Sequence, residues 1–452
     1  MLAACESSDE ASKGRVIVVG AGLAGLSAAD RLADEGWEVV VLEARARVGG
    51  RVWTLHDPET GQYAEAGGEF LDSGHSEMRK LVDRFGLRLE PSYEADEPGR
   101  DIVYVDGALR TYEEFDDAET REQVNRYYEA VDELAADVDP SDPASSPEAE
   151  ELDSATAADG LDELGITGNA RLILENEFST DYGVEADRLS QLFVVSTYAA
   201  AYNQPDSGVE IERVEGGNDQ VAQGLAEDLG DAVRLGSPVT GVRHSGSGVE
   251  VTVTGGEVVE GDWCLLAAPL PALRGIGFTP GLPAPIAQAI GGAQYGPISK
   301  TLLQYPYRFW REEGLSSYAL TDTEAGSTWE ATTGQPGRPG VLTSYASGDL
   351  GLEVLDLSDD RLVAAVSEAV TEVFPGRVPD PIDAQPVRWP LMPYSGGAYV
   401  AWAPGQLSAW YGPLRAGTGR LRFAGEHTAE LSGYMEGAVR SGLRAARQID
   451  SA

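Results

Sequence analysis

The stretch that most constrains the fold is residues 15–51, where an apolar, β-branched run at 16–19 enters a glycine-rich turn. Three glycines follow, Gly20, Gly22 and Gly25, at the spacing of a strand–turn–helix unit that binds a dinucleotide. The first allows the tight turn, the second lets backbone amides approach a pyrophosphate, and the third lets helix and strand lie close together. Because unpaired amides and the helix dipole favour an anion at the helix N-terminus, the pattern predicts a dinucleotide site.

An acidic residue ends the second strand of this unit. A second apolar run at 39–42 leads into Glu43, about 20 residues after the turn, where a carboxylate accepts hydrogen bonds from an adenosine ribose. The glycine turn alone does not distinguish NAD from FAD. A further glycine pair and several arginines follow at once, at 45–51.

The composition bounds the domain count and the partners. At 452 residues the chain is long for one compact domain, so two domains are expected. The formal net charge of −42 argues against nucleic acid, because phosphate contacts need basic patches, and against an anionic membrane surface. No run of about 18 apolar residues occurs, so no transmembrane segment is predicted. The four histidines show no metal-ligand spacing, and no metal site is predicted.

Lysine is nearly absent from this acidic chain. Its 33 basic residues include only three lysines, Lys13, Lys80 and Lys300. An excess of acids with few lysines is typical of proteins adapted to high salt, where self-repulsion is screened. We expect a halophilic protein; the alternative is an acidic protein from a GC-rich genome.

The two cysteines do not indicate a disulfide framework. Cys264 lies in an apolar run and is expected to be buried. Residues 2–5 end in Cys5 and are similar to the lipobox of bacterial-type lipoproteins, with a polar tether over 1–13. The charged and apolar regions of a signal peptide are missing from this start. The alternatives are an exported, lipid-anchored surface protein and a cytoplasmic protein with a chance match.

The remaining pattern alternates between strands and helices. A helix is predicted at 77–85 and an acidic helix at 118–136, followed at 137–160 by a Pro-, Ser- and acid-rich stretch interpreted as a mobile surface segment. A second sheet with helices is expected at 285–390. A final strand and a closing helix at 435–449 complete the chain.

These elements predict an α/β fold in which a Rossmann-like dinucleotide-binding domain, identified as FAD-binding from the resemblance described next, is interleaved with a substrate domain of mixed sheet and helices. The FAD-binding domain is assigned to residues 14–90, 211–285 and 395–452. The substrate-binding domain is assigned to 91–210 and 286–394.

The chain resembles the flavin amine oxidases, and most closely their monoamine oxidase branch. Besides residues 15–51, three stretches carry the resemblance: Lys300 within 296–300, the Trp–Gly–Gly–Tyr spacing of 389–399, and residues 423–442, which match the family's C-terminal flavin signature. The resemblance implies an FAD-dependent oxidase in which Lys300, Tyr399 and Tyr434 are the catalytic residues. The two tyrosines form an aromatic cage, and the lysine holds water against the flavin.

The same resemblance implies the residues that hold FAD. They extend from the adenosine end to the isoalloxazine ring, with Val239 beside the adenine and the amide of Met435 at the flavin. The implied cofactor-binding set is Gly20, Gly22, Gly25, Glu43, Arg45, Gly50, Arg51, Gly67, Gly68, Val239, Trp389, Gly425, Glu426 and Met435.

One departure bears on the cofactor. Animal monoamine oxidases attach the flavin through a cysteine just before the first cage tyrosine, and Ala398 stands there in this chain. Non-covalent FAD is therefore expected.

The resemblance implies that a primary amine is oxidised to an imine, which hydrolyses to an aldehyde and ammonia while O2 becomes H2O2. Amino-acid-oxidising relatives grip the substrate carboxylate with an arginine, often soon after the second glycine pair, where this chain has Glu69 and Asp72. Amines are favoured, and diamines if either acid faces the cavity. An L-amino-acid oxidase is the alternative, and a non-oxidase or desaturase-like FAD protein is the third reading. Formation of a homodimer is left open.

Overall fold

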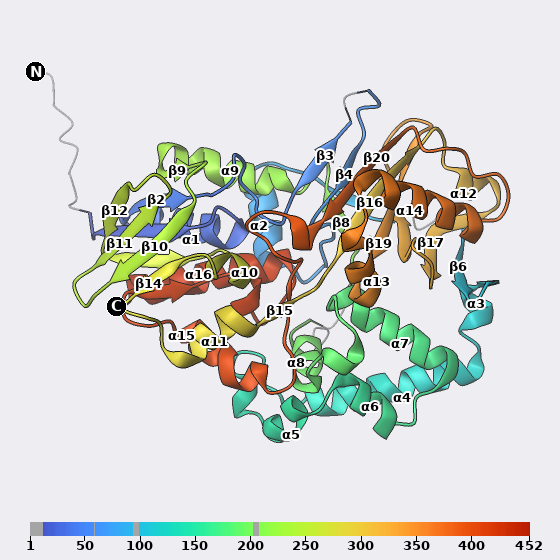
Figure 1. Ribbon diagram of the computed structural model, residues 1–452, viewed down its shortest axis with the longest axis horizontal. Helices are drawn as coiled ribbons and strands as arrows, with labels where there is room; N and C mark the ends of the chain where they lie inside the picture. The colour runs from blue at the N-terminus through green and yellow to red at the C-terminus, as the bar shows by residue number, and fades with distance from the viewer. Residues whose placement is uncertain (1–11, 58, 94–98, 202–207) are drawn as a thin grey trace, which may run out of the picture.

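The computed structural model describes residues 12–57, 59–93, 99–201 and 208–452. Cys5, the predicted site of a lipid anchor, and nearly all of the predicted tether lie outside the described residues. Figure 1 shows two bodies side by side, with one sheet on the left, a larger sheet on the right, and helices α4 to α8 beneath the larger sheet. Within the described ranges, none of the helices has the length and apolarity needed to cross a bilayer.

A five-stranded parallel sheet organises the first body. Its central strands are apolar along their whole length, as expected of a parallel sheet covered on both faces. Three distant stretches of the chain meet in it, which confirms the α/β prediction. The order is β22 (Leu421–Phe423), β13 (Trp263–Leu266), β1 (Arg15–Val19), β2 (Glu38–Leu42) and β9 (Val233–Arg234).

Three helices cover one face of this sheet, packed on Val16, Val18 and Leu265. The closest approach is between the first and the last helix, where a Cβ added at Gly442 would lie 2.1 Å from the carbonyl oxygen of Ala24. The small residues of the closing helix are thus what lets it lie against the dinucleotide-binding helix. The helices are α1 (Leu23–Asp34), α9 (Asp219–Leu229) and α16 (Met435–Asp450).

A four-stranded sheet packs on the opposite face, through Val242, Val251 and Val259 against Ile17 and Cys264. Cys264 is fully buried, as expected, and is a free thiol. The strand order is β12 (Val258–Gly261), β11 (Val249–Val253), β10 (Val239–His244) and β14 (Gly277–Thr279).

The second body is built on a seven-stranded mixed sheet, which lies on the right in Figure 1. Helix α14 (Asp359–Val373) packs on it through Leu362, Val366 and Val370. The strand order is β20 (Asp383–Arg388), β16 (Ser299–Tyr305), β19 (Gly340–Ala346), β18 (Ser327–Glu330), β17 (Leu315–Thr321), β6 (Arg100–Val105) and β7 (Ala108–Thr111).

A layer of helices lies beneath this sheet, and it corrects one prediction. The stretch 137–160, predicted to be a mobile surface segment, instead contains one helix and the start of another, and it packs through Ala149 and Leu152 into the main core. The side chains of Thr156 and Asp159 form a capping box that starts one of them. The helices are α3 (Tyr112–Phe115), α4 (Ala118–Ala135), α5 (Ala149–Ser154), α6 (Ala157–Glu163), α7 (Gly168–Asp181) and α8 (Gln191–Ala201).

The other elements of the fold are short. They are the strand pairs β3 (Thr54–His56) with β4 (Tyr63–Glu65), β5 (Leu89–Pro91) with β8 (Glu212–Val214), and β15 (Gln294–Tyr295) with β21 (Val400–Ala401), and the helices α2 (Ser76–Arg84), α10 (Leu270–Leu273), α11 (Ala284–Gly292), α12 (Phe309–Glu312), α13 (Gly348–Glu353) and α15 (Gly412–Ala416). The strands of the larger sheet all come from 91–210 and 286–394, while the division into domains stays a prediction.

Candidate active site

The main cavity begins at the carboxyl ends of β1, β2 and β13 and reaches Lys300 and Tyr345 of the larger sheet. The carboxyl edge is where open parallel sheets bind ligands. Every residue predicted for the cofactor or for catalysis lines this cavity except Gly25. Those that do are Gly20, Gly22, Glu43, Arg45, Gly50, Arg51, Gly67, Gly68, Val239, Lys300, Trp389, Tyr399, Gly425, Glu426, Tyr434 and Met435.

The glycine turn leaves room beside the N-terminus of α1. A Cβ added at Gly22 would meet no atom within 4 Å, and this residue is the N-cap of a helix that no side chain caps. Gly25 has a different role, because its Cβ would lie 2.0 Å from the carbonyl oxygen of Gly20. The helix therefore lies tight on the turn and presents unpaired amides to the cavity.

Glu43 fixes the backbone of the turn. Its buried carboxylate accepts hydrogen bonds from the backbone N–H of Ala21 and of Arg45, each at 2.8 Å. The residue predicted to hold a ribose thus also ties the first strand to the arginine-bearing extension.

Two arginines of the extension point toward the cavity. Arg51 forms an ion pair with Glu426 at 2.8 Å, and although burial opposes its charge, this carboxylate raises the pKa of Arg51. Arg45 donates to the Ser395 hydroxyl at 2.7 Å and to the Pro393 carbonyl, and forms no ion pair with the described residues. Burial lowers the pKa of Arg45, so an anion beside it would be stabilised.

The N-terminus of α16 is a second source of unpaired amides. Its N-cap, Tyr434, makes no capping bond through its side chain. The one acid in the first turn, Glu436, instead accepts hydrogen bonds from the backbone of α2, from Met78 N–H at 2.8 Å. The positive end of the helix dipole is therefore directed at the cavity beside Met435.

The glycine pair after β4 is required by close packing. A Cβ at Gly67 would lie 1.9 Å from the carbonyl oxygen of Arg51, and one at Gly68 would lie 3.2 Å from Met435. Trp389 is buried beside this pair and donates from Nε1 to the Ala66 carbonyl at 2.9 Å.

Lys300 is buried, and its ammonium is held on several sides. Nζ donates to a carboxylate oxygen of Glu69 at 2.8 Å and to the Gly67 and Glu65 carbonyls at 3.0 and 3.2 Å. The ammonium also lies 5.4 Å from the ring centroid of Trp329. These contacts fix the ammonium at the cavity wall.

Three tyrosines line the same end of the cavity. Tyr399 donates its hydroxyl to the Thr180 carbonyl at 2.6 Å, and the hydroxyls of Tyr399 and Tyr345 lie 2.9 Å apart. Burial raises the pKa of Tyr399 well above its usual value. The ring of Tyr434 meets that of His75 edge-on at 5.4 Å. Burial likewise raises the pKa of Tyr345, so the Tyr345 and Tyr399 phenols are neutral, and the three rings form an apolar wall.

Comparison with known proteins identifies the family of this chain. The model of the family described as "flavin containing amine oxidoreductase" matches residues 23–450. The chain belongs to this family. It is therefore a flavin-containing amine oxidase, and FAD is its cofactor.

Alignments with individual relatives extend over almost the whole of this chain. A putative flavin-containing monoamine oxidase, AofH, of Mycobacterium tuberculosis is 31% identical over 96% of either chain. A flavin-containing amine oxidase of Danio rerio is 29% identical over 96% of this chain and 85% of its own. Among solved structures, a putrescine oxidase bound to putrescine has a TM-score of 0.88 at 27% identity, over 97% of this chain and 99% of its own. A cyclohexylamine oxidase from Brevibacterium oxydans has a TM-score of 0.88 at 28% identity, with the same coverage.

The residues of this amine oxidase fit FAD. The open space at Gly22, two uncapped helix N-termini and the unpaired Arg45 suit a pyrophosphate and an electron-rich ring. Pro238 and Val239 line the adenine end. Ala398 lies on the cavity wall and has no thiol, and Cys264 does not line the cavity, so the described residues offer FAD no thioether.

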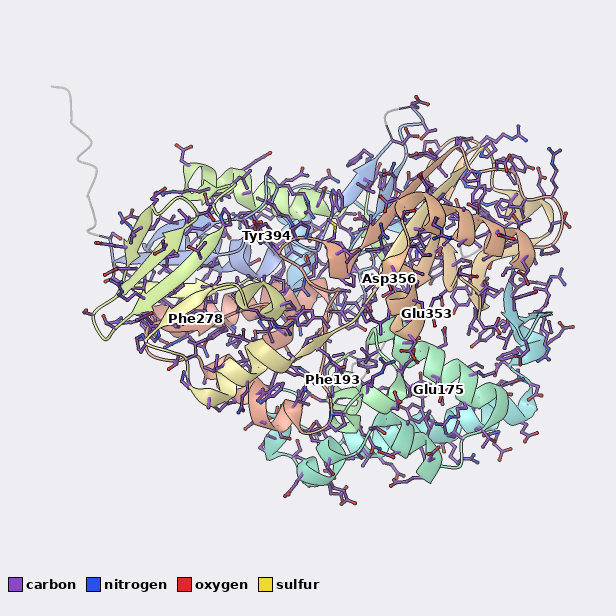
Figure 2. The ribbon with its side chains drawn as sticks, viewed as in Figure 1. Glu175, Phe193, Phe278, Glu353, Asp356 and Tyr394 are labelled. Atoms are coloured by element: carbon purple, nitrogen blue, oxygen red, sulfur yellow. The ribbon has the colours of Figure 1, made fainter. Side chains whose placement is uncertain are left out.

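Two residues of the tyrosine end are missing from the predicted set. Tyr345 stands directly opposite Lys300 in the pairing of β16 with β19, and Trp329 lies on the next strand, 5.3 Å from the ring of Tyr345. Predicting Tyr345 and Trp329 as site residues would have required the register between these strands, which cannot be read from the sequence alone. Tyr394, labelled in Figure 2, also lines the cavity and was not singled out.

The two acids that would have favoured diamines do not face the cavity. The Glu69 carboxylate is engaged by Lys300 and by Arg213, at 2.8 and 3.4 Å. Asp72 accepts from the backbone N–H of Glu210 at 2.7 Å. Neither lines the cavity, so the argument for diamines from these two residues is withdrawn.

Proposed function

We propose that this amine oxidase oxidises a primary amine to an imine, which hydrolyses to an aldehyde and ammonia while O2 is reduced to H2O2. One observation carries the choice of amines over amino acids. The arginines that line the cavity are Arg45 and Arg51, both at the nucleotide end. Around Tyr345, Tyr399 and Tyr434, none of the described lining residues is an arginine that could bind a substrate carboxylate.

When bound, FAD supplies the two-electron chemistry. The protein's own part is to bind the amine, orient it and exclude water. The rings of Tyr399 and Tyr434 provide apolar faces that favour the uncharged amine by desolvation. The hydrogen bonds of Tyr399 to Thr180 and Tyr345 hold its ring in place. Lys300 is fixed at the cavity wall by Glu69, and its positive charge would stabilise the negative charge that develops on oxygen during the oxygen half-reaction.

Carboxylates beside the tyrosine end favour a cationic substrate. Asp181 follows Thr180, the residue to which Tyr399 donates, and retains solvent-accessible surface. Glu210 is also exposed, and its carboxylate lies near those of Asp181 and Asp72, so like charges are crowded together there. A second ammonium group would relieve this charge crowding, which supports diamines as a subclass. The putrescine oxidase among the solved relatives supports the same choice.

The test is a substrate panel with product identification. Monoamines, diamines and L-amino acids are each supplied at equal concentration, and peroxide, aldehyde, ammonia and 2-oxo acid are measured. We expect peroxide with aldehyde and ammonia from amines. Formation of 2-oxo acid from amino acids at higher kcat/KM would favour the L-amino-acid oxidase instead.

The diamine subclass is tested with Asp181→Asn. Loss of a charge pair with the distal ammonium should raise KM for a diamine about tenfold, since charged hydrogen bonds contribute about 1.5–3 kcal/mol. The KM for a monoamine should stay within about twofold. Glu175→Gln, on the same helix α7 (Figure 2) and paired with Arg171, is the matched control. Equal effects on both substrates would count against a diamine subsite.

A further inference from the structure

A second cavity, of about 300 Å³, lies away from the first, between α2, α15 and α16. The two cavities have no lining residue in common within the described part of the chain. Four arginines and two glutamates line it, in a chain whose net charge is −42. The arginines are Arg415, Arg440, Arg444 and Arg447.

Two of these arginines already have a carboxylate partner. Arg415 pairs with Glu430 at 2.9 Å, and Arg440 pairs with Glu436 at 2.6 Å. The other lining acid, Glu77, is paired with a lysine of its own helix. Glu430, Glu436 and Glu77 are therefore each already in an ion pair.

Arg444 has no carboxylate of the described residues within ion-pair distance, although Glu430 of the same cavity lies near enough to act on its charge. Its guanidinium donates only to uncharged oxygens, including Phe423 O at 3.0 Å, Thr428 Oγ1 at 2.9 Å and Arg415 O at 2.8 Å. Its Nε is buried without an acceptor. Burial and the neighbouring Arg415 lower the pKa of Arg444 to about 10. A half-satisfied guanidinium is costly unless an anion approaches it.

Arg447 is the second arginine of this kind. It lies one helical turn beyond Arg444 on the same face of α16, and its exposed side chain forms no ion pair with the described residues. Most of the other arginines in this acidic chain do form one, such as Arg84 with Asp30 at 2.6 Å. Two adjacent guanidinium groups thus face one polar cavity with no ion-pair partner among the described residues.

We propose that this cavity binds a compact divalent oxyanion of the phosphate type. Two such guanidinium groups match two negative charges, and the planar guanidinium fork suits tetrahedral and carboxylate oxygens. The cavity is large enough to hold such an anion.

The site lies behind the flavin-binding segment. Arg415 and Arg444 both donate to Thr428, at 3.2 and 2.9 Å, and the Ser441 hydroxyl accepts from Gly425 N–H at 2.9 Å. Gly425 lines the active-site cavity, whereas Arg444 and Ser441 line the second one. A bound anion would therefore stabilise residues 425–428 from the side opposite to the FAD cavity.

The test is calorimetric titration of the FAD-loaded enzyme with inorganic phosphate at pH 8, in KCl of constant ionic strength. Loaded enzyme is used so that the pyrophosphate cradle is filled. We expect one phosphate per chain, sulfate binding within a few-fold, and acetate at least about tenfold weaker because it carries one charge. Arg447→Gln, an exposed position, should weaken phosphate about tenfold, as loss of a charged hydrogen bond implies.

Arg444→Gln should abolish the binding, and Arg377→Gln is the matched control. Arg377 is exposed and forms no ion pair with the described residues. Absence of saturable phosphate binding, or phosphate affinity unchanged in Arg447→Gln, would overturn the proposal. Acetate binding as tightly as phosphate would overturn the assignment to a divalent anion.

Discussion

The two ends of the active-site cavity are built in different ways. The nucleotide end is made largely of backbone: a glycine turn, the open N-termini of α1 and α16, and Arg45 and Arg51 from one short extension. The tyrosine end is made of side chains. Lys300, Trp329 and Tyr345 come from neighbouring strands of the larger sheet and are in mutual contact, while Tyr399 and Tyr434 lie outside that sheet.

This difference predicts different sensitivities. A backbone cradle fails when a side chain fills it, whatever the chemistry of that side chain. In a side-chain cluster, a single substitution removes only part of the function, because the neighbouring hydrogen bonds and ion pairs remain. The substitutions below test the contrast.

The largest effect is expected at the nucleotide end, from Gly22→Val. The backbone at Gly22 is extended, with φ of −78°, so valine is tolerated, but its side chain would occupy the space for the pyrophosphate. We expect FAD affinity to fall by at least about 100-fold, since a steric overlap of this kind exceeds about 3 kcal/mol. Flavin absorbance per protein measures it.

Gly281→Val is the control for that substitution. Gly281 also has free space and no positive φ, and it lies outside the cavity. It should purify with a full complement of FAD. A yellow, stoichiometric Gly22→Val enzyme would break the account of the nucleotide end.

Lys300→Met tests the ion pair at the tyrosine end. Breaking a buried pair destabilises by about 3 kcal/mol, although Arg213 and Trp329 remain beside Glu69. We expect slower reoxidation of the reduced enzyme by O2, by about tenfold, measured by stopped flow. Lys300→Met with Glu69→Gln should recover stability but not the reoxidation rate. Unchanged reoxidation in both variants would remove the role given to Lys300.

Glu65→Gln tests burial at the same end. Burial raises the pKa of Glu65 to about 8 from about 4.5, so the folded protein holds a proton that the unfolded chain releases. The associated stability is fully present below pH 4.5 and is lost as the pH rises through 8. Relative to Glu65→Gln, the natural chain should lose on the order of 2 kcal/mol between pH 5 and 8, measured by chemical unfolding. A constant difference across this range would contradict the prediction.

The smallest effect is expected from Tyr399→Phe. The ring stays, and only the hydroxyl bonded to Thr180 and Tyr345 is lost. We expect kcat/KM for amines to fall about fivefold, as loss of about 1 kcal/mol implies. Tyr345→Phe is the matched variant from the partner hydroxyl. A loss of more than 100-fold from Tyr399→Phe would assign the hydroxyl a direct chemical role.

The same contrast explains what could be predicted from the sequence. The nucleotide end was found because Gly20, Gly22 and Glu43 lie close together in the chain and each answers a local geometric need. Tyr345 and Trp329 were missed, because their contact with Lys300 depends on pairing between strands distant in sequence.

Local composition also misled in one place. The Pro, Ser and acid content of residues 137–160 predicts a mobile segment, yet its second half is helical and Leu152 is buried where α5 packs on α8. Tertiary burial outweighed local propensity there. Glu69 shows the same limit, since a sequence cannot tell whether an acid faces a cavity or an ion pair with Lys300.

The central claim is that the tyrosine end accepts an amine and passes its electrons to FAD. The most direct measurement is anaerobic mixing of the FAD-loaded enzyme with a panel of primary amines and L-amino acids, with flavin absorbance followed in time. The account predicts bleaching by amines, and no bleaching or far slower bleaching by amino acids. Bleaching by amino acids alone, or by neither class, would contradict it.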